Sequence, residues 1–225
     1  MYVLLLAVSS LFVNTNKIYK KHSRYYRCLL NGFTALAAWF LRIKIHTEGL
    51  EKIPEGTRFL LVQNHRSKFD PILTWLVLKK YDVAFISKEA NMHIPIFGRI
   101  IRKCCFMAID REDPGKALGT VKNAAQLIRD NQVSIGIYPE GTRNRGEGLL
   151  PFHNAVFKIA QLGKVPIVVT AMKGADNVAK NFPRHHTDVY LTITGVLNYE
   201  DIAKAKTSAI GEEVERQIKE AYAKN

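Results

Sequence analysis

The chain has 225 residues, of which 47% are hydrophobic, and a formal net charge of +13. This length fits one domain with or without an appendage, and the three cysteines give no sign of a zinc site or an oxidising compartment. The positive charge suits polyanionic partners. The sequence shows no zinc spacing, no aromatic RNA-binding strand and no recognition-helix pattern, so we expect phosphorylated metabolites or anionic lipid rather than nucleic acid.

The amino-terminal region is basic and contains two apolar runs, Tyr2 to Val13 and Cys28 to Leu41, with no acidic residue before Glu48. Both runs are shorter than the roughly 20 residues that a spanning helix needs. We therefore predict that residues 1–42 form two amphipathic helices, a hairpin that attaches the protein to anionic lipid at the cytoplasmic face of the cell membrane, as a monotopic or peripheral protein. A signal peptide, a single span and ordinary core helices remain alternatives, although the segment before the first run lacks Lys and Arg.

From residue 43 onward, strand-like runs alternate with helix-like runs. Several strand-like runs are almost wholly apolar, for example Phe59–Val62 and Pro166–Val169, as expected for a sheet covered on both faces. The alternation predicts that residues 43–225 form an α/β domain with a largely parallel central sheet of about seven strands flanked by helices. The predicted strands are Ile43–Thr47, Arg58–Gln63, Val83–Ser87, Cys105–Ile109, Val133–Tyr138, Pro166–Ala171 and Val189–Thr194. The predicted helices are Pro71–Lys80, Ile94–Lys103, Gly115–Asp130, His153–Leu162 and Tyr199–Ala223.

The segment Asn64–Asp70 places a histidine and an aspartate five positions apart, between a predicted strand and a predicted helix. Pro71 marks the helix start, so His65 falls in a loop from which its ring can fold back towards Asp70. A carboxylate bound to one ring nitrogen fixes the tautomer and leaves the other nitrogen free to act as a base. His65 and Asp70 are therefore candidate catalytic residues. Alternatively, Asp70 only caps the helix and His65 bonds to backbone.

Two further polar segments follow predicted strands, and the carboxyl ends of parallel strands share one edge of a sheet. Arg111 follows Cys105–Ile109, and Arg143 lies in a glycine-bearing turn after Val133–Tyr138. Guanidinium groups suit bidentate contact with phosphate, but each arginine could instead pair with an acidic surface neighbour. Glu140 either shapes the turn or bonds substrate hydroxyls.

Four segments in this order resemble the blocks of the glycerolipid acyltransferases, in particular the 1-acylglycerol-3-phosphate acyltransferase type. The resemblance runs from about Ile43 to Gly195, and the first and third blocks are specific on their own. The segments are Asn64–Asp70, Phe106–Arg111, Tyr138–Arg143 and Val165–Val169.

The resemblance implies a role for each block. His65 is the base, Asp70 orients it, and Arg111 and Arg143 bind the glycerol phosphate together with the loop residues Glu140, Gly141 and Thr142. Two departures stand out: Phe152–Ala155 lies where members often carry a lysine and a glycine, and Asn144 replaces a frequent serine. Lys68, Arg145 and Lys158 are candidates to replace the missing lysine at the phosphate.

The expected reaction moves a fatty acyl group from an acyl-CoA or acyl carrier protein thioester to the sn-2 hydroxyl of lysophosphatidate (1-acylglycerol 3-phosphate), giving phosphatidate for phospholipid biosynthesis. No metal and no prosthetic group are expected, because the thioester is a co-substrate and the substrate hydroxyl is the nucleophile. Alternative acceptors are glycerol 3-phosphate and other lysophospholipids. Other readings are a non-catalytic binder of anionic lipid, a hydrolase that uses His65 on water, and an enzyme with Ser67 as nucleophile.

Overall fold

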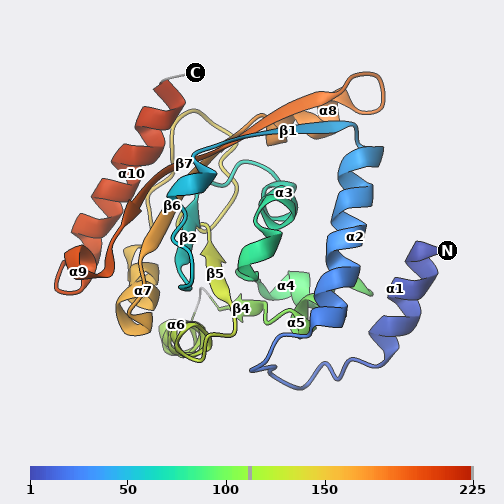
Figure 1. The fold of residues 1–225 in the computed structure, drawn as a ribbon, viewed down its shortest axis with the longest axis horizontal. Helices are drawn as coiled ribbons and strands as arrows, with labels where there is room; N and C mark the ends of the chain where they lie inside the picture. The colour runs from blue at the N-terminus through green and yellow to red at the C-terminus, as the bar shows by residue number, and fades with distance from the viewer. Residues whose placement is uncertain (111–112, 224–225) are drawn as a thin grey trace.

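A seven-stranded sheet forms the centre of the structure, a computed structural model that describes residues 1–110 and 113–223 (Figure 1). The strand order is β1-β7-β6-β2-β5-β3-β4. Strands β6 and β7 are antiparallel and the other neighbouring pairs are parallel, which confirms the predicted sheet. The strands are β1 (Ile43–Glu48), β2 (Leu60–Gln63), β3 (Val83–Lys88), β4 (Met107–Ile109), β5 (Ser134–Ile137), β6 (Ile167–Lys173) and β7 (Thr187–Leu197).

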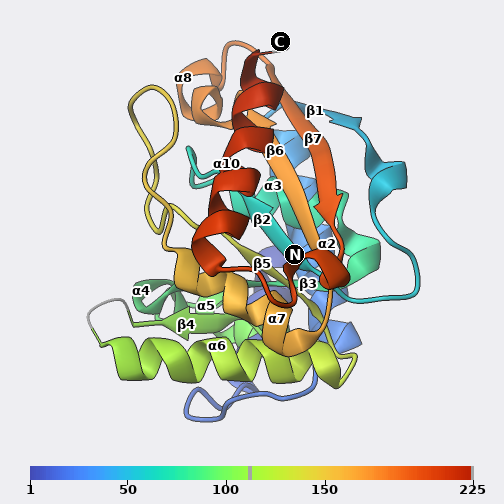
Figure 2. The ribbon, with the colours of Figure 1, turned by 90° about the vertical axis from the view of Figure 1, so that its left-hand side faces the viewer.

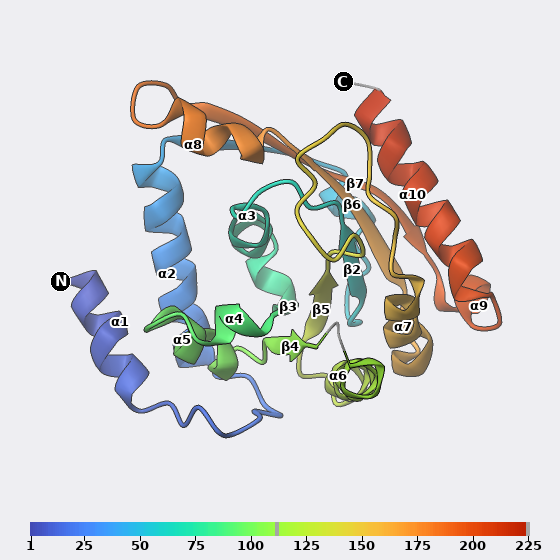
Figure 3. The same ribbon diagram turned by 180° about the vertical axis from the view of Figure 1, so that it is seen from behind.

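Helices cover both faces of the sheet, which explains why its central strands are continuously apolar. Leu61 of β2 belongs to the core on one face, while Leu60 and Val62 belong to the core on the other, because successive side chains of a strand point to opposite faces. One face carries α2 (Arg24–Phe40), α3 (Asp70–Val77) and α5 (Phe97–Lys103), and the other carries α6 (Pro114–Arg129), α7 (Lys158–Gly163) and α10 (Thr207–Ala223) (Figures 1 and 3). The shorter elements are η1 (Leu50–Lys52), η2 (Lys79–Tyr81), α4 (Glu89–Met92), η3 (Asn154–Phe157), η4 (Ala175–Asn177), α8 (Val178–Asn181) and α9 (Tyr199–Ile202).

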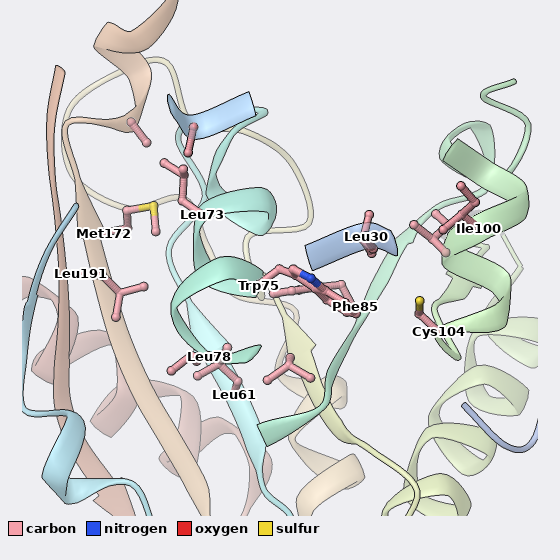
Figure 4. Close-up of a cluster of buried hydrophobic side chains, with 14 of the residues drawn as sticks. Leu30, Leu61, Leu73, Trp75, Leu78, Phe85, Ile100, Cys104, Met172 and Leu191 are labelled. Carbon is pink, nitrogen blue, oxygen red and sulfur yellow. The ribbon is translucent and has the colours of Figure 1, made fainter. Parts of the chain in front are cut away.

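Trp75 of α3 joins the amino-terminal region to the sheet (Figure 4). Its indole N–H donates to Asn31 Oδ1 of α2 at 2.6 Å, and the guanidinium of Arg27 lies 4.6 Å from the ring centroid. Arg27 is buried and donates to the carbonyls of Asp82 and Val83 at 2.7 and 3.1 Å. Helix α2 therefore shares the core of the α/β domain, and the division into residues 1–42 and 43–225 stays a prediction.

Both apolar runs of the amino-terminal region are helical, in α1 (Tyr2–Leu11) and α2. The two helices keep many large apolar side chains on the surface: Val3, Leu4, Leu5, Val8 and Leu11 of α1, and Leu36, Trp39 and Phe40 of α2. Within the described ranges, no helix combines the length and the apolar character that crossing a membrane requires.

The carboxyl-terminal segment differs from its prediction, because the single helix expected over Tyr199–Ala223 is two helices, α9 and α10. Gln161 of α7 donates through Nε2 to the carbonyls of Ile202 and Ala205, at 2.8 and 2.9 Å. These bonds satisfy carbonyls that a break in a helix leaves without intrahelical partners. The break lets α10 begin in a new direction and bury Ile210, Val214 and Ile218, spaced four residues apart, against the sheet.

Candidate active site

His65 lies in the loop between β2 and α3, and its ring folds back onto Asp70 as predicted. The ring Nδ1 is 2.8 Å from Asp70 Oδ2. The Asp70 side chain is only 1% exposed, whereas the imidazole is 18% exposed. With Nδ1 bound to the buried carboxylate, Nε2 is the ring nitrogen left to exchange a proton with a substrate.

Asp70 fixes the loop as well as the ring. Its Oδ2 also accepts the backbone N–H groups of Arg66 and Ser67, at 2.7 and 2.8 Å. The N-cap residue of α3 is Phe69, so the carboxylate of Asp70 binds the residues before the helix and does not cap it. One buried oxygen thus orients the imidazole and holds the segment that carries it.

Tyr138, directly after β5, stacks its ring on the imidazole of His65. Its ring centroid is 4.2 Å from that of His65, with 23° between the ring planes, and Phe85 stacks behind it at 5.7 Å. Burial raises the pKa of Tyr138 well above its ordinary value, so the ring stays neutral. An aromatic face against the imidazole limits the rotation of its ring. This contact of Tyr138, the first residue of the third block, was not predicted from the sequence.

Glu140 joins the first and third blocks through backbone contacts. It is buried, and its Oε1 accepts the backbone N–H of His65 at 2.7 Å while Oε2 accepts that of Leu150 at 2.9 Å. The carbonyl of His65 in turn accepts the backbone N–H of Asn144 at 2.7 Å. Both polar backbone groups of His65 are therefore held by the β5–η3 loop. This geometry favours loop shaping over substrate contact for Glu140.

Replacement of Glu140 by alanine should destabilise the site more than replacement of the exposed Glu147 in the same loop. Each backbone N–H that becomes buried without a partner costs about 1–3 kcal/mol, and displacement of His65 should lower kcat as well. Urea unfolding and steady-state kinetics of Glu140→Ala and Glu147→Ala measure both effects. Equal stability of the two variants would show that these contacts contribute little.

The same carboxyl group predicts a pH dependence. Burial raises the pKa of Glu140 above 4.5, and the N–H bonds from Leu150 and His65 only partly oppose this effect. A raised folded-state pKa stabilises the fold below the unfolded-state value and loses that contribution as the pH rises through the folded-state value. The wild type should therefore lose stability relative to Glu140→Gln as the pH rises from 4.5. A pH-independent difference between their unfolding free energies would contradict this assignment.

Four other predicted site residues lie in the loops that follow β2 and β5. Gly141 has φ 69°, a left-handed conformation that glycine adopts without strain, and its N–H donates to the carbonyl of Tyr138 at 3.0 Å. Thr142 and Arg143 follow it and are exposed, and Lys68 is exposed in the β2–α3 loop. Figure 2 shows this loop and the β5–η3 loop on the same side of the molecule. Arg111 lies outside the described residues.

A further positively charged side chain, that of Lys88, lies at the end of β3. Lys88 is the last residue of β3, is exposed, and pairs in register with Ile109 of β4. Strands β2, β5, β3 and β4 are parallel, so Lys88 lies at the same sheet edge as the His65 loop. Lys88 was not predicted as a site residue from the sequence.

Two residues of the first block bind backbone deep in the fold. Asn64 donates to the carbonyl of Met172 at 3.0 Å and to the hydroxyl of Tyr222 at 2.7 Å, and accepts the Met172 N–H at 2.8 Å. Ser67 is buried and its hydroxyl donates to the carbonyl of Ala175 at 2.8 Å. Ser67 thus helps to fix the loop, which weakens the case for it as a nucleophile.

Asn144, one of the two departures from the family pattern, also has a structural role. It is buried, donates through Nδ2 to the carbonyl of Gly148 at 2.9 Å, and accepts the N–H of Gly146 at 2.8 Å. The asparagine thus closes the turn that presents Arg143. In the part of the chain that the structure describes, no group of three or more His, Cys, Asp or Glu side chains is arranged to hold a metal ion.

The structure is that of an α/β protein in which a buried carboxylate binds an imidazole at the carboxyl edge of the parallel strands, where the sites of such sheets lie. The family model described as acyltransferase matches residues 44–173, a span that runs from the second residue of β1 to the end of β6 and includes all four blocks. The chain belongs to the acyltransferase family.

Curated relatives include several proteins named 1-acyl-sn-glycerol-3-phosphate acyltransferase. The Haemophilus influenzae protein is 32% identical over 149 residues, which cover 63% of this chain and 61% of that protein. The Escherichia coli protein is 30% identical over 52% of this chain and 48% of its own length. The chain thus spans about half to three-fifths of these two relatives. The Bacillus subtilis protein is 24% identical over 87% of this chain and 96% of its own length.

The fold is similar to the crystal structure of the 1-acyl-sn-glycerophosphate acyltransferase PlsC from Thermotoga maritima. The TM-score is 0.72, and the match covers 99% of this chain and 89% of that one at 23% sequence identity. At this identity the likeness concerns the fold.

Proposed function

We propose that this protein transfers an acyl group from a thioester to the sn-2 hydroxyl of 1-acylglycerol 3-phosphate, giving phosphatidate. The observation that carries the proposal is the 2.8 Å contact between His65 Nδ1 and the buried carboxylate of Asp70, which leaves Nε2 as the base. The relatives whose printed names specify this acceptor support the choice of substrate.

In the proposed mechanism, Nε2 of His65 takes the proton of the sn-2 hydroxyl as its oxygen attacks the thioester carbonyl. Asp70 stabilises the imidazolium that forms. Pro71 has no N–H, and the N–H of Asp70 donates to the carbonyl of Ser67 at 3.3 Å. The N–H of Ile72, in the same first turn of α3, is therefore the proposed donor to the negative charge that develops on the carbonyl oxygen. The carbon–sulfur bond then breaks, the thiolate takes the proton from His65, and no covalent enzyme intermediate forms.

The experiment that tests this function supplies labelled lysophosphatidate or glycerol 3-phosphate, each with acyl-CoA or with acyl carrier protein thioester. We expect labelled phosphatidate from lysophosphatidate, and the comparison of donors identifies the thioester. Product formation from glycerol 3-phosphate but not from lysophosphatidate would refute lysophosphatidate as the acceptor. Binding of lysophosphatidate without product from any pair would favour the non-catalytic lipid binder.

We assign the acceptor phosphate to Arg143, Lys68 and the turn at Gly141 and Thr142. The family resemblance adds Arg111, which lies outside the described residues. Replacement of Arg143 by alanine should raise the KM for lysophosphatidate by about tenfold, because a hydrogen bond to a charged group contributes about 1.5–3 kcal/mol and surface exposure reduces that contribution. The kcat should change little if the contact is equal in the ground and transition states. The matched control is Arg184→Ala, an exposed arginine before β7. An unchanged KM would refute the phosphate assignment.

The apolar surface of α1 and α2 is proposed to insert into the membrane interface at the cytoplasmic face. Trp39 is 76% exposed, and burial of a large apolar side chain contributes about 1.5–3 kcal/mol. Trp39→Asp should therefore weaken sedimentation with anionic vesicles about tenfold or more. Leu118→Asp on α6, a 44% exposed residue on the other side of the sheet, adds the same charge and should leave binding unchanged. Equal losses in both variants would refute this orientation.

A further inference from the structure

A groove of about 720 Å³ lies between α1 and the segment that joins α4 to α5. Its apolar wall includes Leu4, Val8 and Leu11 of α1 and Ile94 and Ile96 of the α4–α5 segment. Leu4, Val8 and Leu11 are 67%, 47% and 71% exposed, so the wall continues into the apolar surface proposed to meet the membrane. Helices α1 and α5 lie side by side in Figures 1 and 3. The groove is therefore placed to receive an aliphatic chain.

Two arginines of α5 give the same groove a strongly cationic wall. Arg99 and Arg102 are three residues apart, a spacing that puts both on one face of a helix, and both side chains are half-buried. The Nε atom of Arg102 is shielded from solvent and lacks a hydrogen-bond acceptor among the described residues. Within residues 1–110 and 113–223, neither guanidinium forms an ion pair or a hydrogen bond with another residue.

A half-buried cation without a partner costs free energy unless a ligand supplies the missing acceptors. The groove's titratable residue His93 is already paired, at 3.2 Å, with Glu89. The amino-terminal residues Thr15 and Asn16, which line the groove after α1, are uncharged, and the sequence has no acidic residue before Glu48. The charge of the groove therefore favours an anionic ligand, and guanidinium groups suit the oxygens of phosphate.

The backbone at the groove is strained, as it often is at binding sites. Ile96 has φ 62°, which is rare for a β-branched residue. The N–H of Phe97 donates to the carbonyl of Pro95 at 2.6 Å across it, so the three residues form a γ-turn. Such strain persists only where the surrounding structure enforces it and is concentrated at functional sites. This turn leads directly into α5, the helix that carries both arginines.

We propose that this groove binds one anionic phospholipid of the membrane, with its phosphate on Arg99 and Arg102 and an acyl chain along α1. The inference rests on the proposed membrane attachment and is independent of the acyl transfer at His65. The bound lipid would hold α1 against α5 and so tie the membrane-facing helix to the enzyme domain.

The test uses the full chain in neutral detergent, where no anionic surface is present, with phosphatidylglycerol or phosphatidylcholine added before native mass spectrometry. The wild type should retain one phosphatidylglycerol and no phosphatidylcholine. The double variant Arg99→Gln, Arg102→Gln should lose this occupancy at least tenfold. The matched control Lys20→Gln, Lys21→Gln removes the same charge from exposed positions and should bind like the wild type. Equal binding of both lipids, or equal losses in both variants, would overturn the proposal.

A second measurement separates a membrane lipid from the substrate. With a soluble short-chain lysophosphatidate, the Arg99→Gln, Arg102→Gln variant should turn over at the wild-type rate. A fall in that rate would place the groove within the substrate site and overturn the assignment to a separate lipid. If the wild type forms no phosphatidate, the proposed function fails. The mass spectrum still shows whether the groove binds an anionic lipid. Thermal unfolding of both double variants checks that they fold.

Discussion

Replacement of His65 by alanine is expected to lower the kcat of phosphatidate formation by about 10²–10⁴-fold, the usual contribution of a positioned general base. The substrate hydroxyl is a poor nucleophile until its proton is removed, and His65 Nε2 is the base that the site presents next to the buried carboxylate of Asp70. The KM for lysophosphatidate should change much less, because phosphate contacts are assigned to other residues.

The variant should remain folded, which makes the kinetic result interpretable. The imidazole is only partly buried, and Asp70 Oδ2 keeps the backbone N–H groups of Arg66 and Ser67 when the ring is removed. Far-ultraviolet circular dichroism, thermal unfolding and vesicle sedimentation should match the wild type. A folded, membrane-bound His65→Ala protein with full turnover would remove His65 from the mechanism.

The second large effect is expected for Asp70→Asn. In the wild type, Oδ2 of Asp70 contacts three groups, the ring of His65 and two backbone N–H groups. An amide in its place presents one oxygen and one NH₂ group. If the amide oxygen keeps the backbone bonds, its NH₂ group donates to Nδ1, and the proton of the neutral ring moves to Nε2. The base is then lost through the wrong tautomer, so kcat should fall by about 10²–10⁴-fold.

The KM should again change little, because Asp70 is buried behind the imidazole. Steady-state kinetics of Asp70→Asn should be compared with Asp201→Asn, an exposed aspartate of α9, and urea unfolding separates lost catalysis from lost stability. Retention of half the wild-type kcat by folded Asp70→Asn protein would mean that the carboxylate only supports the loop.

Local patterns predicted the strands and the contact between His65 and Asp70 because the causes are local. The run Phe59–Val62 is apolar at every position, and β2 buries alternate residues in the cores on both faces of the sheet. Pro71 lies in the first turn of α3 and marks its start, so His65 could be expected in a loop from which the imidazole reaches the carboxylate. Sequence spacing was enough in both cases.

The contacts that hold this pair in place could not be predicted in the same way. Glu140 binds the His65 N–H across 75 residues, and Tyr222 meets Asn64 across 158 residues. Both contacts require β2 to lie between β5 and β6, an order that no single segment encodes. The break between α9 and α10 has the same origin, because it depends on Gln161 of α7.

The two amino-terminal helices illustrate an intermediate case. Their apolar character was visible in the sequence, but the packing of α2 against Trp75 through Asn31 and Arg27 depends on the fold. This packing couples the proposed membrane-facing surface to α3, the helix that begins at Asp70. A membrane attachment through α1 and α2 would therefore fix the position of the site relative to the lipid surface.

The most direct test of the central claim follows the labelled acyl group of a thioester, with and without lysophosphatidate, in the wild type and in His65→Ala. If an imidazole held by a buried carboxylate activates the lipid's own hydroxyl, label should enter phosphatidate only in the wild type and only when the acceptor is present. The protein itself should stay unlabelled. Release of free fatty acid at an undiminished rate without acceptor, or stable label on the protein, would contradict this account.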